Sequence, residues 1–254
     1  MSKLLTIQID TGTAPIDVRL VMPRLGDLSE STFRQLIMNL SRYFMRLNLC
    51  FSLDRTDSEL CQFQRGELAP SAFSPELQAV YQLALKAQTD TGNAFDPFYT
   101  GTFDPRGLLK GWMLFQAFET YLRPLLQDQS LVAAAINGGG DVQMGVTARS
   151  KFVWNVGVES PSDMSHVIKR YRVKNGAMAT SMRGGSAIGG PIQCQEGDPS
   201  LNQATVLAPS LIVADTLATT AVAMGERAFA AFKQQHHLEI IGLLVTAQDN
   251  LVEF

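Results

Sequence analysis

The amino-acid sequence predicts an α+β fold, and three observations support that prediction. Short, alternating apolar runs near the amino terminus and in the second half of the chain indicate strands. Apolar residues at three- and four-residue spacing between those runs indicate helices. The sequence also lacks the GxGxxG and GxxxxGK[ST] signatures, which counts against a dinucleotide-binding fold and a P-loop NTPase. We therefore do not expect a doubly wound parallel sheet.

The first part of the chain is expected to form a hairpin followed by a helix. Residues 4–9 and 16–22 read as two strands separated by the turn sequence TGTAP. An apolar stripe from Phe33 to about Leu47 predicts the helix, with an N-cap among residues 27–30.

Two further helices are expected in the middle of the chain, over about residues 75–89 and 108–126. The second of these contains few charged residues, so we expect it to be buried.

The second half of the chain is expected to be rich in strands. The runs at 130–138, 152–160, 166–173 and 176–182 are apolar and rich in β-branched or small residues, and we expect them to lie in one sheet. A long loop follows over 183–200. A strand (203–210), a helix (about 214–234) and a closing strand (237–247) then complete the chain.

Length and composition restrict the class of protein. With 254 residues, 46% hydrophobic and 18% charged, residues 1–254 are expected to form a single domain, with one large core or two intimately packed lobes. The net charge is −3 and the basic residues are scattered, so we expect no nucleic-acid partner. No stretch is apolar enough to predict a transmembrane segment or a signal peptide. The expected location is cytoplasmic for the chain as written, or periplasmic if a leader has been trimmed.

The cysteines and histidines offer little chemistry. Three cysteines without metal-ligand spacing predict neither a disulfide framework nor a zinc site, and Cys50, in an apolar run, is expected to be a small buried residue. Of the three histidines, His236 and His237 lie near an expected helix end, where capping is the ordinary role.

Four acidic residues lie beside glycine, proline or alanine: Asp96, Asp104, Asp141 and Asp215. Each has an ordinary structural explanation, because Asp before Pro forms turns, Asp after glycines closes loops and Asp before a helix can be its N-cap. Their order along the chain is more informative than any one of them.

Seven short blocks carry that order: FSLDRTDSEL (51–60), NAFDP (93–97), DPRGLLKGW (104–112), INGGGDV (136–142), WNVGVESP (154–161), GAMATSM (176–182) and ADTLATTAVAMG (214–225). Together they resemble the ApbE family of FAD:protein FMN transferases. The resemblance implies an enzyme that uses Mg²⁺, binds FAD as substrate, and transfers FMN to a Ser or Thr hydroxyl of an acceptor flavoprotein, releasing AMP. It also implies a mainly antiparallel sheet with packed helices around a flavin cleft.

The resemblance implies a role for eight residues. Asp215 and Thr219 correspond to side-chain ligands of the metal, and Gly107 to a ligand through its carbonyl oxygen. Such hard oxygen ligands suit Mg²⁺, which neutralises charge on a transferring phosphoryl group. The positions that correspond to FAD contacts are Ala94, Phe95, Asp96, Asp104 and Lys110, the last as a partner for phosphate.

Three departures from the family pattern stand out. Asp54 occupies the position of an aromatic residue that lines the flavin site, and residues 183–193 lack the histidine that is usual in the active site. No catalytic residue is therefore assigned. Arg106 replaces a glycine, and it either adds a phosphate contact or is simply a surface charge.

Three functions remain open. The first is active FMN transfer, the second is binding or hydrolysis of FAD without a protein acceptor, and the third is a non-catalytic paralogue. We favour the first, because decay of the site would erode Asp215, Thr219 and Lys110 as readily as the histidine.

Overall fold

The computed structural model describes residues 3–11, 15–23, 28–184 and 200–254. Within these ranges, the main sheet consists of β1 (Lys3–Ile9), β2 (Ile16–Met22), β3 (Ala133–Gly138), β4 (Asp141–Val146), β7 (Gly176–Met182), β8 (Leu201–Ala208), β9 (Ile241–Thr246) and β10 (Leu251–Glu253). These eight strands are ordered β1-β2-β3-β4-β7-β8-β9-β10, and every neighbouring pair is antiparallel. The predicted α+β fold with a mainly antiparallel sheet is confirmed.

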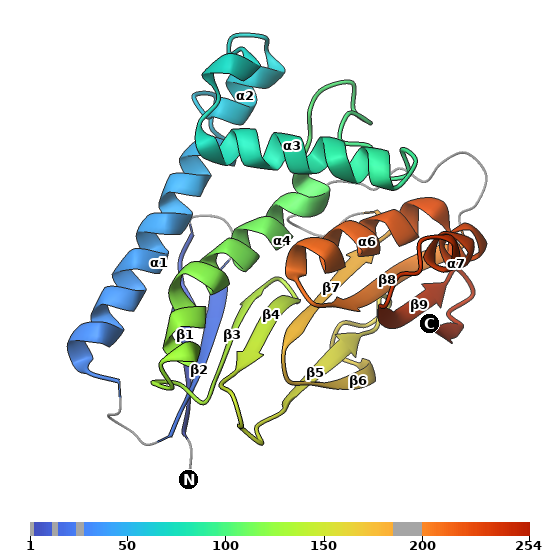
Figure 1. Cartoon of the computed structure of the whole chain (residues 1–254). Helices are drawn as coiled ribbons and strands as arrows, with labels where there is room; N and C mark the ends of the chain where they lie inside the picture. Colours follow the sequence, from blue (N-terminus) through green and yellow to red (C-terminus); the bar gives the residue numbers. More distant parts are fainter. Residues whose placement is uncertain (1–2, 12–14, 24–27, 185–199) are drawn as a thin grey trace.

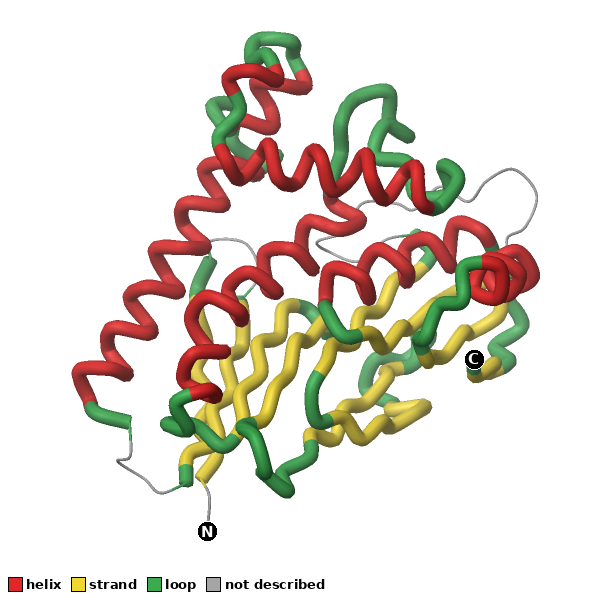
Figure 2. The backbone as a smooth tube through the Cα atoms, in the orientation of Figure 1, coloured by secondary structure: helices red, strands yellow, loops and turns green. Residues whose placement is uncertain are grey.

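Helices cover one face of this sheet (Figures 1 and 2). In chain order they are α1 (Glu30–Phe51), α2 (Glu59–Gln64), α3 (Pro75–Asp90), α4 (Arg106–Ala117), α5 (Arg123–Gln127), α6 (Leu211–Met224) and α7 (Glu226–Gln235). A 3₁₀ turn, Pro70–Ala72, precedes α3. None of these described helices combines the length and the apolarity needed to cross a bilayer.

The amino-terminal predictions are confirmed. β1 and β2 form the expected hairpin, with Ile9 opposite Ile16. Helix α1 begins within the expected range, because the Ser29 side chain accepts a hydrogen bond from the Thr32 N–H and caps the helix. Cys50, near the end of α1, is buried as expected.

The predicted helix at 108–126 is a continuous helical stretch with a change of pitch. It starts as α4 at Arg106, passes through a π-helical turn at Phe118–Leu122 and ends with α5. Its apolar face packs into the main core, so the expected burial is confirmed. This helix crosses the sheet beside α6 (Figure 1).

The prediction of one helix over 214–234 is wrong in two respects: the helix starts earlier, and it is divided into two helices. It begins at Leu211, where the Ser210 side chain caps it by accepting from the Val213 N–H. It breaks at Gly225, whose φ of 81° suits glycine and separates α6 from α7. Asp215 is therefore not an N-cap; it lies inside α6.

The expectation that all the later strands share one sheet is wrong. β5 (Trp154–Glu159) and β6 (Val167–Val173) pair with each other in a separate two-stranded sheet. The reason is that β7 occupies the edge of β4 in the main sheet. Trp154 and Val158 belong, with Met144, to a second apolar cluster. It lies on the side of the main sheet away from the helices (Figure 1). The two-stranded sheet thus covers the face that the helices leave open (Figure 1).

Two strands and a helix escaped the sequence analysis. β4 was obscured because Gly139 and Gly140 read as part of a loop, whereas they form a tight turn with φ values of 62° and 93°. β10 is a short edge strand, and α2 is a short helix in the block at 51–60. Most of the expected loop at 183–200 lies outside the described residues.

Candidate functional site

Two pairs of residues bring α4 and α6 into close contact. A Cβ atom on Gly107 would lie 3.2 Å from the Thr219 methyl carbon, and one on Gly111 would lie 2.7 Å from Cβ of Asp215. Glycine is thus required at both positions for the two helices to approach this closely. Gly107 and Gly111 are four residues apart, so both lie on one face of α4; Asp215 and Thr219 likewise lie on one face of α6. Because Gly107 meets Thr219 and Gly111 meets Asp215, the two helices run antiparallel.

The Asp215 carboxylate is buried between these helices. Its Oδ2 atom accepts a hydrogen bond from the Gly111 N–H at 2.8 Å, the sole donor to this carboxylate among the described residues. Burial raises the pKa of Asp215 to about 8, and the negative charge of Asp141 adds to the increase. Lys110 and the Gly111 N–H act in the opposite direction but do not cancel it. Without a further cation, this carboxyl group therefore holds its proton near neutral pH.

One turn further along α6, the oxygen atoms of Thr219, Gly107 and Ser181 lie close together. The Thr219 hydroxyl donates to the Gly107 carbonyl oxygen at 3.1 Å, and its Oγ1 lies 3.2 Å from Oγ of Ser181 on β7. Thr219 and Ser181 are both buried. Together with Asp215, they form a set of hard oxygen donors from three elements.

This set fits a magnesium ion better than a softer metal. No cluster of three His, Cys, Asp or Glu side chains occurs in the described ranges, so a metal there would depend on carbonyl and hydroxyl oxygens. Mg²⁺ is commonly held by one or two carboxylates, with waters and substrate phosphates completing its octahedron. The raised pKa of Asp215 also fits, because a bound cation would stabilise its ionised form. The structure thus brings together Gly107, Asp215 and Thr219, the three residues predicted to hold the metal.

Lys110 and Asp141 form a buried ion pair next to this set. The Lys110 ammonium nitrogen lies 2.7 Å from Asp141 Oδ2, with side-chain exposures of 16% and 1%. The other carboxylate oxygen, Oδ1, accepts from the Thr180 N–H at 2.9 Å. Burial alone would lower the pKa of Lys110, but the charges of Asp141 and Asp215 outweigh it, so the pKa is raised. Lys110, predicted as a phosphate partner, is thus already paired with an acid.

Asp104 belongs to a second charged cluster, at the start of α4. Its carboxylate oxygens lie 2.9 and 3.0 Å from Nε of Arg106, and Oδ2 lies 2.5 Å from Nη2. It also accepts from the Arg106 backbone N–H at 3.1 Å and from the Tyr99 hydroxyl at 3.3 Å. Arg106 is therefore not a free surface charge.

The predicted FAD-contacting segment 94–96 lies against the same helix start. The Phe95 ring lies 2.9 Å from the position that a Cβ on Gly107 would take. Ala94 and Phe95 are buried, and Asp96 Oδ1 accepts from the Gln88 side chain at 3.0 Å and from the Phe98 N–H at 2.9 Å. This arrangement gives Phe95 a packing role at the site.

Several site residues were missed by sequence reasoning. Gly111, Thr180 and Ser181 lie within the quoted motifs but received no role. The available signal for Gly111 was its four-residue spacing from Gly107. Asp54 is exposed, in the loop after α1. Most of the segment in which the family histidine is absent lies among residues 185–199, outside the described residues.

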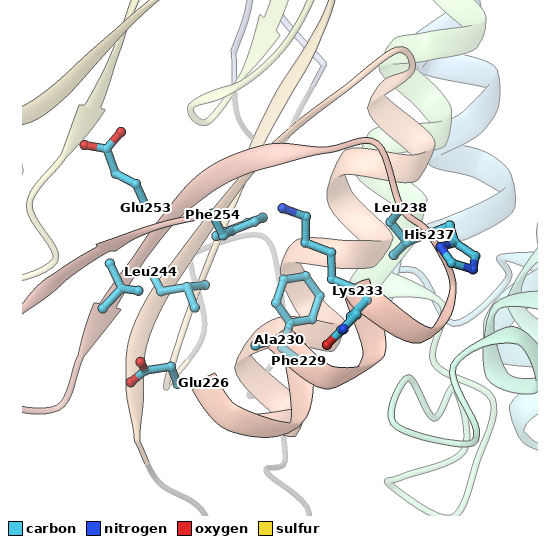
Figure 3. Close-up of a pocket in the computed structure, with 11 residues that line it drawn as sticks. Glu226, Phe229, Ala230, Lys233, His237, Leu238, Leu244, Glu253 and Phe254 are labelled. Atoms are coloured by element: carbon cyan, nitrogen blue, oxygen red, sulfur yellow. The ribbon is translucent and has the colours of Figure 1, made fainter.

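A separate hollow lies beside α7 and the last two strands (Figure 3). It has a volume of about 540 Å³, and its lining includes Phe229, Lys233, His237 and Phe254. The Lys233 ammonium lies 5.1 Å from the centre of the Phe254 ring. None of the site residues described above lines it.

Comparisons with known proteins find a matching family model and several solved structures with a similar fold. The family model described as "ApbE family" matches residues 100–242, more than half of the sequence. The flavin transferase ApbE from Vibrio cholerae is similar in structure with a TM-score of 0.75 and 19% identity, covering 100% of this chain and 97% of that one. The ApbE protein from Thermotoga maritima has a TM-score of 0.72 and 18% identity, with coverages of 98% and 96%.

A third similar structure is the apo form of the flavinyl transferase ApbE from Pseudomonas stutzeri. Its TM-score is 0.75 with 16% identity, and the match covers 100% of this chain and 94% of that one. At these identities, the three similarities establish a shared fold. No curated protein matches the sequence significantly.

Proposed function

Because this chain belongs to the ApbE family, we propose that it is a flavin transferase that uses FAD and Mg²⁺. In the proposed reaction it transfers FMN to a Ser or Thr hydroxyl of an acceptor flavoprotein and releases AMP. The observation that carries the proposal is the oxygen set made by Gly107, Asp215 and Thr219 where α4 meets α6. The printed names of the similar structures, which describe flavin or flavinyl transferases, point in the same direction.

The proposed reaction is a phosphoryl-type transfer. A bond forms between the acceptor hydroxyl oxygen and the phosphorus of the FMN half, and the bond from that phosphorus to the bridging oxygen of AMP breaks. The hydroxyl proton is released to solvent, and AMP departs with the electron pair of the broken bond. Such transfers depend mainly on positioning and on charge stabilisation, with little covalent work by the protein.

The residues of this chain have distinct tasks in the proposal. The Asp215 carboxylate, the Thr219 hydroxyl and the Gly107 carbonyl would hold Mg²⁺, with Ser181 beside them. A bound magnesium ion neutralises charge on the diphosphate. The N–H of Gly111 orients the Asp215 carboxylate, and the Lys110–Asp141 pair supplies a fixed, buried charge arrangement beside it.

One assay tests this function. The protein is incubated with FAD, MgCl₂ and a candidate acceptor flavoprotein, and both AMP and the mass of the acceptor are measured. We expect AMP in equal amount to acceptor that has gained the mass of FMN less one water. Chelation of magnesium with EDTA should stop both signals.

The same assay separates the remaining alternatives. Release of AMP without any gain of mass on the acceptor favours hydrolysis of FAD. If no AMP is released and a parallel titration detects no binding of FAD, the proposal is contradicted and a non-catalytic paralogue is favoured.

A further inference from the structure

We propose that Arg106 binds the diphosphate of FAD, and that Asp104 and Tyr99 position it rather than contacting FAD directly. This inference rests on the proposed function. The sequence left two roles open for Arg106, a phosphate contact or a surface charge. The inference assigns it the first.

The guanidinium of Arg106 is oriented by the Asp104 carboxylate. Its Nε–Nη2 edge is held by the Asp104 carboxylate at 2.5 to 3.0 Å. A guanidinium has five N–H donors in a fixed plane, so one edge can hold a carboxylate while the remaining donors bind a second anion. Arg106 keeps a side-chain exposure of 32%, whereas Asp104 keeps 4%. The cation therefore reaches the surface, while the acid that orients it does not.

Asp104 itself is not free to accept from a ligand. Besides the guanidinium, it accepts the Arg106 backbone N–H and the Tyr99 hydroxyl. These donors engage both carboxylate oxygens, which together offer about four lone-pair sites. The role that suits Asp104 is to fix Arg106, and the buried ion pair holds the guanidinium in one orientation before a ligand arrives.

The alternative cation at the site is less available. The Lys110 ammonium is committed to Asp141, and its side chain is half as exposed as that of Arg106. Arg106 also directly precedes Gly107 in the chain, so the Cα atoms of the two residues are about 3.8 Å apart. The Gly107 carbonyl is one of the proposed metal ligands. A diphosphate bound at that metal would therefore lie near the start of α4, where Arg106 is anchored.

The chemistry of the ligand matches this cation. The diphosphate of FAD carries two negative charges near neutral pH, and the planar fork of arginine binds phosphate oxygens in pairs. With a magnesium ion bound, Arg106 and Lys110 would bring the positive charge of the site to four, against two negative charges on the diphosphate and three on Asp104, Asp141 and Asp215.

The test measures FAD binding instead of turnover. Wild type and Arg106→Gln are titrated with FAD in MgCl₂ by calorimetry, at low and at high NaCl. Loss of a charge-assisted contact should weaken FAD binding by about 10- to 100-fold. The variant should also show a smaller dependence of affinity on salt, which a purely structural defect would not produce. Arg106→Lys, which keeps the charge but loses the fork, should fall between the two.

Two variants control for folding and for surface charge. Arg106→Gln leaves Asp104 buried without its partner, so the double variant Asp104→Asn with Arg106→Gln is tested as well, and it should show the same loss of affinity. Arg65→Gln removes an arginine that donates two hydrogen bonds to the carboxylate of Glu67, also two residues away. This ion pair is far more exposed, with side-chain exposures of 43% for Arg65 and 54% for Glu67. That variant should bind FAD as the wild type does.

The outcomes distinguish the inference from the function on which it rests. If wild type binds FAD and the folded double variant binds it equally well, the inference about Arg106 is wrong while the proposed function stands. An equal loss in Arg65→Gln also overturns it. If wild type does not bind FAD, both the inference and the proposed function are wrong.

Discussion

The backbone N–H of Gly111 donates to the Asp215 carboxylate over 2.8 Å, although 104 positions separate the two residues in the chain. This bond ties the middle of α4 to the interior of α6. The orientation of the acid that we expect to hold the metal is therefore set by a residue whose side chain is a hydrogen atom.

Gly111→Ala should impair both the fold and the metal site. The added Cβ would lie 2.7 Å from Cβ of Asp215 and from the Leu211 carbonyl oxygen, so the helices must separate. Such overpacking costs about 1–3 kcal/mol of unfolding free energy. Urea unfolding measures that cost, and calorimetry measures the expected loss of Mg²⁺ affinity. An alanine variant with the wild-type urea midpoint and Mg²⁺ affinity would contradict the close packing.

Asp215→Asn should change how stability depends on pH. Folding raises the pKa of Asp215 from its ordinary 3.8 to about 8, so the folded state binds the proton more tightly than the unfolded state. In EDTA, this group's contribution to wild-type stability is greatest below pH 4 and is lost as pH rises to about 8. Relative to the asparagine variant, wild type should thus become less stable across that range.

Urea unfolding of both proteins at several pH values measures this difference. Parallel pH profiles for the two proteins would show that the carboxyl group is not perturbed. With wild type, Mg²⁺ should bind more tightly as pH rises toward 8, because the ion displaces the proton. The asparagine variant should show neither that trend nor magnesium-dependent release of AMP.

Two substitutions of Thr219 test the contribution of its hydroxyl group separately from that of its side-chain shape. Thr219→Val keeps the branched side chain but removes the oxygen that lies 3.1 Å from the Gly107 carbonyl. We expect about a tenfold loss of Mg²⁺ affinity, which corresponds to about 1.4 kcal/mol, whereas Thr219→Ser should stay close to wild type. Equal affinities for the valine and serine variants would remove Thr219 from the proposed ligand set.

Lys110→Met should destabilise the protein strongly, because it leaves the Asp141 carboxylate buried without its cation. Removing one partner of a buried ion pair typically costs about 3–5 kcal/mol. Adding Asp141→Asn should recover most of that loss. Urea unfolding of the two single variants and the double variant gives the coupling between the residues.

A matched surface pair provides the control for Lys110. Lys86 and Asp90 also lie 2.7 Å apart, but their side chains are 70% and 54% exposed. Lys86→Met should therefore change stability by less than about 1 kcal/mol. A similar cost for the two lysine variants would mean that burial does not govern the strength of the inner pair.

Prediction from the sequence succeeded for the elements whose pattern is local. The stripe that begins at Phe33 was enough to predict α1, and the alternation around TGTAP was enough to predict the first hairpin. It failed where the choice of partner depends on distant segments. Nothing local to β5 and β6 shows that β7 takes the place beside β4. The break at Gly225 was not apparent because residues on both sides of it favour helix.

The same distinction applies to the site. The spacing of Asp215 and Thr219 placed both on one face of a helix without any knowledge of the fold. The partners of those residues were not readable, because Gly111, Ser181 and Asp141 reach them only through packing. Nor could sequence alone show that Lys110 is paired with Asp141, or that Arg106 is held by Asp104.

The antiparallel pairing of α4 and α6 also has a consequence for the newly synthesised chain. Gly107 and Thr219 lie 112 residues apart, so at synthesis rates of roughly 5–20 residues per second the first half of the ligand set waits roughly 5–20 s for the second. During that interval the glycine face of α4 has no partner helix. Binding of the proposed magnesium ion would therefore follow synthesis of most of the chain, and the ion would not guide the earlier stages of folding.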